Sequence, residues 1–110
     1  MATNKDFAAK VLATLHPLDI LAKPMFGEYG LYLKGRMFGL LCDDTLFIKV
    51  TNAGSELAGH TAKALPYPNA KLAFKISAAK MKDREWLTAL VEATTDELPI
   101  PKKKSRRKSP

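Results

Sequence analysis

The sequence predicts an α+β domain of two layers, in which an antiparallel sheet carries helices on one face. Two segments near the ends of the chain, 3–16 and 82–98, repeat apolar residues at the three- and four-residue spacing of a helix. Segments between them alternate apolar and polar residues, which is typical of strands with one buried face. The chain has 110 residues, 46% hydrophobic and 26% charged, so its size and composition are those of one globular domain.

The first helix is expected over residues 3–16. Thr3 or Asn4 can cap it, because a side-chain oxygen there accepts a hydrogen bond from a first-turn amide. Its apolar stripe consists of residues four apart, namely Phe7, Val11 and Leu15. Pro17 ends the helix, since the residue before a proline avoids the α region.

The segment after this helix changes to a strand-like period. Residues 20–26 contain Pro24, which cannot donate to a ladder, so we expect an edge strand or irregular chain there. Residues 27–30 resemble a turn or bulge, in which Gly27 and Gly30 take positive-φ or crowded positions.

A meander of three strands follows, over residues 31–33, 36–42 and 45–50. Lys34-Gly35 and Asp43-Asp44 are the expected two-residue turns between them. In the third strand the period-2 alternation directs one set of side chains to the buried face, namely Leu46, Ile48 and Val50.

The second half of the chain predicts a short helix around 54–58, a strand over 71–76 and a long helix over 82–98. Asp83 is the expected cap of the long helix. The apolar face of that helix consists of Trp86, Leu87, Leu90, Val91 and Leu98. Pro99 and Pro101 end it.

Few residues suggest catalysis or metal binding. His16 and His60 are the only histidines, and neither is closely spaced with Cys42 as metal ligands are. The acids that follow Cys42 raise a thiol pKa rather than lower it, and Asp43-Asp44 reads as a solvated turn. We therefore expect no enzyme, no catalytic residue, no metal and no cofactor.

The chain shows no membrane or secretory signal. No run reaches the roughly 18 apolar residues of a membrane span, and the N-terminus lacks a basic patch followed by an apolar stretch. The single cysteine excludes an intrachain disulfide. A cytoplasmic protein is therefore expected.

Positive charge is concentrated at the C-terminus. Residues 1–101, the expected folded domain, contain twelve basic and eleven acidic residues, whereas 102–110 contribute six of the seven net positive charges. The basic residues of this tail are Lys102, Lys103, Lys104, Arg106, Arg107 and Lys108. Because it lacks apolar residues, we expect the tail to be disordered. It could contact the phosphates of DNA, act as a nuclear address, or only increase solubility.

One face of the sheet is predicted to be apolar without a helix over it. Tyr32 and Phe47 point away from the leucine-rich face if the alternation holds. An open sheet face with aromatic residues is typical of a partner interface, so a homodimer is the preferred interpretation. The alternative is that the small helix or a loop covers this face.

The segment from Met25 to Leu40 resembles the TfoX N-terminal domain family. The resemblance rests on Met-Phe-Gly-x-Tyr-Gly-Leu-Tyr-Leu, and the motif and turn residues carried over are Met25, Phe26, Gly27, Tyr29, Gly30 and Gly35. It continues into the strand 46–50 and covers about Phe7 to Leu98. Glu28 departs from the glycine that the family often has, and 77–79 lacks its usual tyrosine and proline.

The resemblance implies an α+β fold similar to secretion-chaperone-like domains, often dimeric, in a bacterial cytoplasmic protein. Members with a second domain regulate natural competence together with a transcription activator at promoters. With 110 residues we expect a stand-alone member that lacks this second domain. The resulting hypothesis is a small non-enzymatic regulator with a transcription-factor partner and weak DNA contact through the tail. The alternative is a dimeric, chaperone-like protein-binding module without a DNA role.

Overall fold

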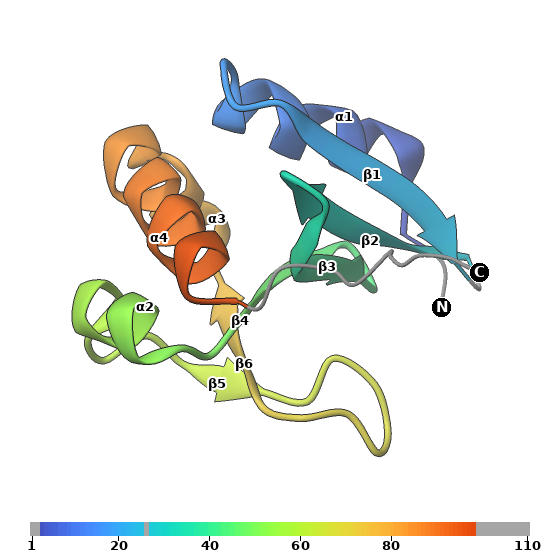
Figure 1. The fold of residues 1–110 in the computed structure, drawn as a ribbon. Coiled ribbons are helices and arrows are strands. Elements are labelled where there is room, and N and C mark those ends of the chain that lie inside the picture. Colours follow the sequence, from blue (N-terminus) through green and yellow to red (C-terminus); the bar gives the residue numbers. More distant parts are fainter. Residues whose placement is uncertain (1–2, 26, 99–110) are drawn as a thin grey trace, which may run out of the picture.

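Six strands form one antiparallel sheet in the order β1-β2-β3-β4-β6-β5 (Figure 1). The computed structural model describes residues 3–25 and 27–98. The elements are α1 (Lys5–Leu15), β1 (Ile20–Met25), β2 (Glu28–Leu33), β3 (Arg36–Cys42), β4 (Thr45–Lys49), α2 (Asn52–Ala58), β5 (Lys63–Ala64), β6 (Ala73–Ile76), α3 (Ala78–Met81) and α4 (Arg84–Glu97). Phe26 and the basic tail, with the disorder expected there, lie outside the described residues. The predicted α+β class is confirmed.

The helix α1 starts at the predicted position and Asn4 is its cap. The Asn4 side chain accepts a hydrogen bond from the amide of Asp6 at 2.6 Å. Thr3, the other capping candidate, is buried and has a different role. Its amide donates to the carbonyl of Gly27 at 3.0 Å, and its hydroxyl donates to the Glu28 carboxylate. The start of the chain is thereby bound to the β1–β2 connection.

The edge strand expected around Pro24 is present as β1, which pairs with β2 alone. The expected turn at 27–30 is only half right. Gly27 has φ 81° and lies in the turn, but Gly30 is inside β2 and pairs with Lys23 on one side and Leu40 on the other. The strand therefore begins at Glu28, three residues earlier than predicted, because pairing on both sides extends it through the glycine.

Alanine at Gly27 is expected to lower the free energy of unfolding by about 1–2 kcal/mol, because a Cβ is strained at positive φ. Urea melts of Gly27→Ala and Gly27→Asn measure this loss, and the asparagine variant should lose less because asparagine tolerates this conformation better. Equal midpoints for wild type and Gly27→Ala would show that the turn does not require a glycine.

Both predicted two-residue turns are present. Lys34 and Gly35 have φ 55° and 77°, and Asp43 and Asp44 have φ 52° and 54°. Positive φ at both central residues is the type I′ geometry that matches the twist of a hairpin. Aspartate tolerates this region better than most side chains.

The core lies between the sheet and the helices. Leu46 and Ile48 of β4 are fully buried in it, as the alternation predicts. The prediction that Val50 faces the core is wrong, because β4 ends at Lys49 and Val50 is 40% exposed. The largest core side chains are Phe38, Phe74, Leu15, Leu31, Leu41, Leu46, Ile48, Leu87 and Leu90.

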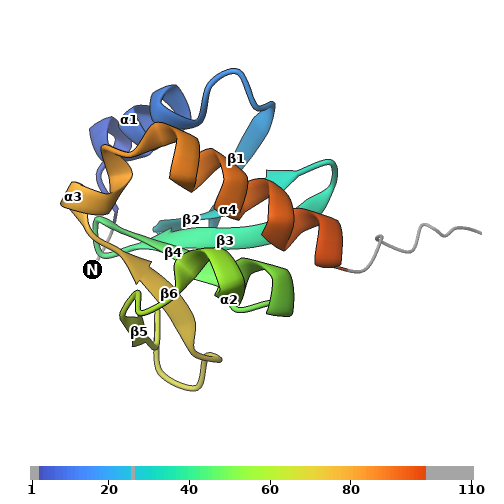
Figure 2. The same cartoon turned by 90° about the vertical axis from the view of Figure 1, so that its left-hand side faces the viewer.

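The helices cover one face of the sheet, as predicted. Figure 2 shows α4 crossing in front of β2 and β3, with α1 above it and α2 below. Asp83 caps α4 by accepting from the amide of Trp86, and the Glu97 carboxylate binds the first amides of α2. The opposite face of the sheet, called the outer face here, has none of the helices described for residues 3–25 and 27–98.

Two short elements were not predicted from the sequence. These are β5, with two residues, and α3, with four. β5 pairs with β6 across the connection 65–72, which Figure 1 shows extending away from the helices.

Candidate functional site

The outer face of the sheet carries the apolar side chains that the helices leave uncovered. Strand pairing places Leu40 beside Phe47 and Tyr32 beside Met37. Successive side chains of a strand point to opposite faces, and the neighbours Leu46 and Ile48 belong to the helix-side core. The predicted outward phase of Phe47 is therefore correct.

Phe47 itself is not at the surface. It is 6% exposed and forms a second small cluster with Cys42 and Ala73, against which Leu40 and Ala64 pack. The chain around β5 and β6 covers it, which is the loop alternative considered for this face. Tyr32 is half-buried, and the ammonium of Lys23 lies 5.0 Å from the centre of its ring. Of the two predicted interface residues, only Tyr32 is accessible.

The loop 65–72 carries three exposed large apolar side chains near this face. Leu65 is 54%, Tyr67 52% and Leu72 55% exposed. Pro66 and Tyr67 line two hollows together with Leu40 of β3, one toward each end of that strand. Exposed apolar side chains grouped around hollows are typical of an interaction site.

The first hollow, called the acidic groove here, has a volume of about 540 Å³. It lies at the Cys42 end of β3, and Glu28 and Asp43 are the charged residues of its wall. Met25 and Tyr29 of the family motif also line it.

The second hollow, called the basic groove here, has a volume of about 670 Å³. It lies at the Met37 end of β3, and its charged residues are Lys49 and Lys71. Leu98, directly after α4, lines it as well.

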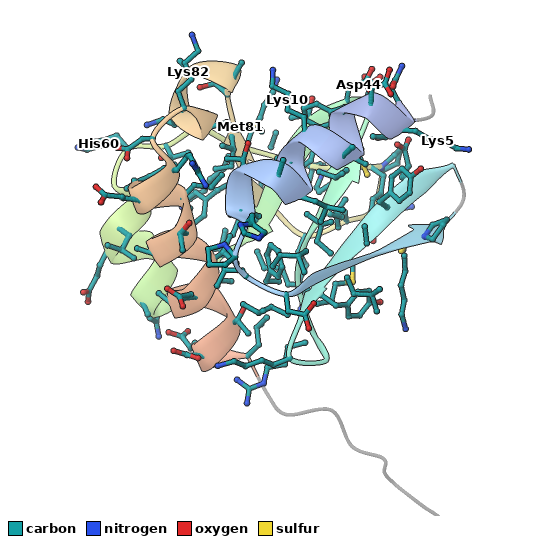
Figure 3. All side chains as sticks on the ribbon, turned by 90° about the horizontal axis from the view of Figure 1, so that it is seen from above. Lys5, Lys10, Asp44, His60, Met81 and Lys82 are labelled. Atoms are coloured by element: carbon teal, nitrogen blue, oxygen red, sulfur yellow. The ribbon has the colours of Figure 1, made fainter. Side chains whose placement is uncertain are left out.

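Glu28 is held in place by hydrogen bonds. Its carboxylate accepts from the hydroxyl of Thr3 and, at 3.2 Å, from the amide of Asp43. The backbone N–H of Asn4 donates to the Asp44 carboxylate at 2.7 Å. Figure 3 shows Asp44 beside the start of α1. The glutamate that departs from the family pattern therefore joins the N-terminus to two hairpin turns.

Charge and burial perturb two titratable groups of the outer face. Burial, reinforced by the negative charge of Glu28, raises the pKa of Cys42 to about 11, so the thiol is protonated at neutral pH and a weak nucleophile. Burial and the positive charge of Lys71 lower the pKa of Lys49. Two like charges thus face each other in the basic groove.

The residue types that commonly serve in catalysis are scattered. His16 follows α1 and His60 follows α2, and Figure 3 shows His60 far from Asp44. Within residues 3–25 and 27–98, no three histidine, cysteine or acidic side chains gather as metal ligands would. No helix in that part of the chain has the length and apolar character needed to span a membrane.

The motif residues have separate structural roles. Gly27 and Gly35 are turn residues, Gly30 is a crowded strand residue, and Met25 and Tyr29 line the acidic groove. The nucleic-acid contacts predicted for Lys102, Lys103, Lys104, Arg106, Arg107 and Lys108 lie outside the described residues. Sequence reasoning missed Leu40 and Tyr67 as surface residues of the site. An apolar loop, Leu-Pro-Tyr-Pro at 65–68, was the available signal.

Two comparisons place the chain among known proteins. The sequence model of the TfoX N-terminal domain matches residues 11–98. A protein of Spirochaeta aurantia, described as an uncharacterized 12.7 kDa protein in the trpE 5′ region, is 34% identical over 112 aligned positions. The alignment covers 100% of this chain and 96% of that relative.

Proposed function

Because the chain belongs to the TfoX N-terminal domain family, we propose that it is a small non-enzymatic regulatory protein that acts by binding other proteins. The observation that carries the proposal is the outer face, where two grooves flank Leu40 and Tyr67 without a covering helix in the described structure. The thiol on this face is buried and protonated, and the two described histidines lie apart from each other, one after α1 and one after α2.

The first partner in this proposal is a second copy of the chain. Tyr67 is 52% exposed, and Leu65 and Leu72 from the same loop add apolar area. Removing such side chains from water favours association by roughly 25 cal/mol per Å² buried. A homodimer through the outer face thus keeps the interface predicted at Tyr32 but replaces Phe47 by Tyr67.

The regulatory part of the proposal adds a transcription-factor partner, a role in transcription or competence, and weak DNA contact through residues 102–110. The tail's six basic residues support the DNA contact, because phosphates bind clustered lysine and arginine. The alternative, a chaperone-like module, shares the dimer and lacks the DNA contact. Salt-dependent binding to DNA separates the two functions.

Tyr67→Lys is expected to dissociate the homodimer, because the lysine must lose hydration to enter an apolar interface. Sedimentation equilibrium at micromolar concentration should show a dimer for wild type and a monomer for Tyr67→Lys. Leu57→Lys is the matched control: Leu57 is 41% exposed but lies on α2, on the helix side, so this variant should remain dimeric. A monomeric wild type would contradict the homodimer.

A further inference from the structure

The charges of the outer face are separated along β3. Glu28 and Asp43 border the acidic groove at the Cys42 end of the strand, and Lys49 and Lys71 border the basic groove at the Met37 end. The two turns of β3 repeat this polarity, because Lys34 lies in the turn before the strand and Asp43-Asp44 form the turn after it. Leu40, Pro66 and Tyr67 lie between the two ends and line both grooves.

A two-fold axis gives this arrangement a specific consequence. In an isologous interface the same patch is used by both copies, so residue i meets j and residue j meets i. An axis that lies in the interface near Leu40 and Tyr67, parallel to the sheet and perpendicular to β3, exchanges the two ends of that strand. The acidic end of one copy then lies over the basic end of the other, twice in each dimer.

We propose that the outer face binds a second copy of this chain in antiparallel orientation, with Asp43 and Glu28 of each copy opposite Lys71 and Lys49 of the other. The inference rests on the proposed homodimer and adds the relative orientation of its two copies, called the register here. Opposed charges at an interface fix orientation and exclude the reversed arrangement, in which like charges meet.

The isolated chain favours this register in a second way. Burial and the repulsion from the Lys71 ammonium both disfavour the charged form of Lys49 and lower its pKa. Carboxylates supplied by a second copy relieve that repulsion. Two further lysines of the outer face, Lys23 on β1 and Lys75 on β6, lie on either side of β3. Both are exposed, and their side chains are long enough to extend into water at the rim of the interface.

A charge exchange tests the register. Lys71→Glu and Asp43→Lys, each alone, place like charges together twice per dimer and should weaken self-association about tenfold. A mixture of the two variants restores opposite charges at both contacts. The lysine at 43 has a precedent in this fold, since Lys34 adopts φ 55° where Asp43 has φ 52°.

Native mass spectrometry of the equimolar mixture at low salt, with one variant of each pair labelled with ¹⁵N, resolves the three dimers by mass. We expect the heterodimer well above the statistical half of the dimer population. The matched control is a mixture of Lys10→Glu and Glu92→Lys, on α1 and α4, which should give the statistical distribution. Figure 3 shows Lys10 on the helix layer, away from the outer face.

The outcomes distinguish the register from the dimer itself. A dimeric wild type with a statistical Lys71→Glu and Asp43→Lys mixture overturns the proposed register and leaves the homodimer standing. A monomeric wild type overturns both. Should Asp43→Lys fail to fold, the salt dependence of the wild-type dimer decides: opposed charges predict weaker association as salt rises, and like charges predict stronger association.

Discussion

Gly39→Ala is expected to lower the free energy of unfolding by about 3 kcal/mol or more, at the upper end of what overpacking costs. A Cβ at this position would lie 2.2 Å from the carbonyl oxygen of Phe47 and 3.3 Å from the Cα of Ile48. Both atoms belong to the backbone of β4, which pairs with β3 in the middle of the sheet. Relief would require the two strands to separate where their ladder holds the core.

Gly30→Ala is the matched control for this prediction. Gly30 also lies inside a strand, but its Cβ would first meet the sulfur of Met25, at 3.0 Å, and then side-chain atoms of Tyr32 and Met37. These are parts of flexible side chains that can move, so the loss should be much smaller. Urea melts of the two variants compare them directly, and similar midpoints would show that the β3–β4 backbone yields easily.

The contrast between these glycines shows what local sequence can establish. Gly27 was predicted as a special backbone position and has φ 81°. Gly30 shares that prediction but is a strand residue, and the sequence around Gly39 predicts no special backbone requirement. The requirement at Gly39 comes from a carbonyl on the neighbouring strand, and no pattern within 36–42 records that neighbour.

Elements with a strong local signal were predicted best. The Asp83 cap, the Lys34-Gly35 turn and the alternation of Leu46 with Phe47 each depend on residues a few positions apart. β5 was not predicted, because two residues are too few to show the alternation of a strand. It forms by pairing with β6. Val50 was placed in the core because the alternation gives no sign of where a strand ends.

The candidate site was predicted in part for the same reason. The period of β4 gives the side of the sheet that Phe47 faces, but its burial depends on the chain around β5 and β6, which lies more than 15 positions away in sequence. The two grooves arise where that loop meets Leu40. Local sequence patterns cannot predict a contact between residues so far apart in the chain. The apolar composition of 65–68, in contrast, can be recognised from the sequence as an indication of an exposed apolar loop.

The tail prediction has the largest expected effect on binding. Residues 102–110 carry six of the seven net charges, so DNA affinity should be located there. Six engaged phosphates give a slope of log K against log salt of about −5, and engagement of fewer phosphates gives about −3 to −5. Raising salt from about 50 to about 200 mM should then reduce affinity roughly a hundredfold to a thousandfold.

Fluorescence anisotropy with a labelled duplex at several salt concentrations measures this slope for the full chain and for a chain that ends at residue 101. Truncation should abolish binding, and binding by the full chain should show little sequence preference, because phosphate contacts carry no base information. The folded domain keeps its cap, turns and core, so its melting temperature should change little. The truncated chain also provides the control for the dimer, because the outer face does not include the tail in this proposal.

Equal DNA binding by the full and the truncated chain would contradict the prediction that the tail binds DNA. It would place the DNA site on the folded domain instead. Lys34 and Lys49 would then be the first candidates, since both are exposed near the Met37 end of β3. Arg36 would be a poorer candidate, because its Nη1 donates to the carbonyl of Thr95 at 2.8 Å and its Nε is buried. Absence of binding by either chain at low salt would favour the chaperone-like module, in which the outer face of the sheet is the functional surface.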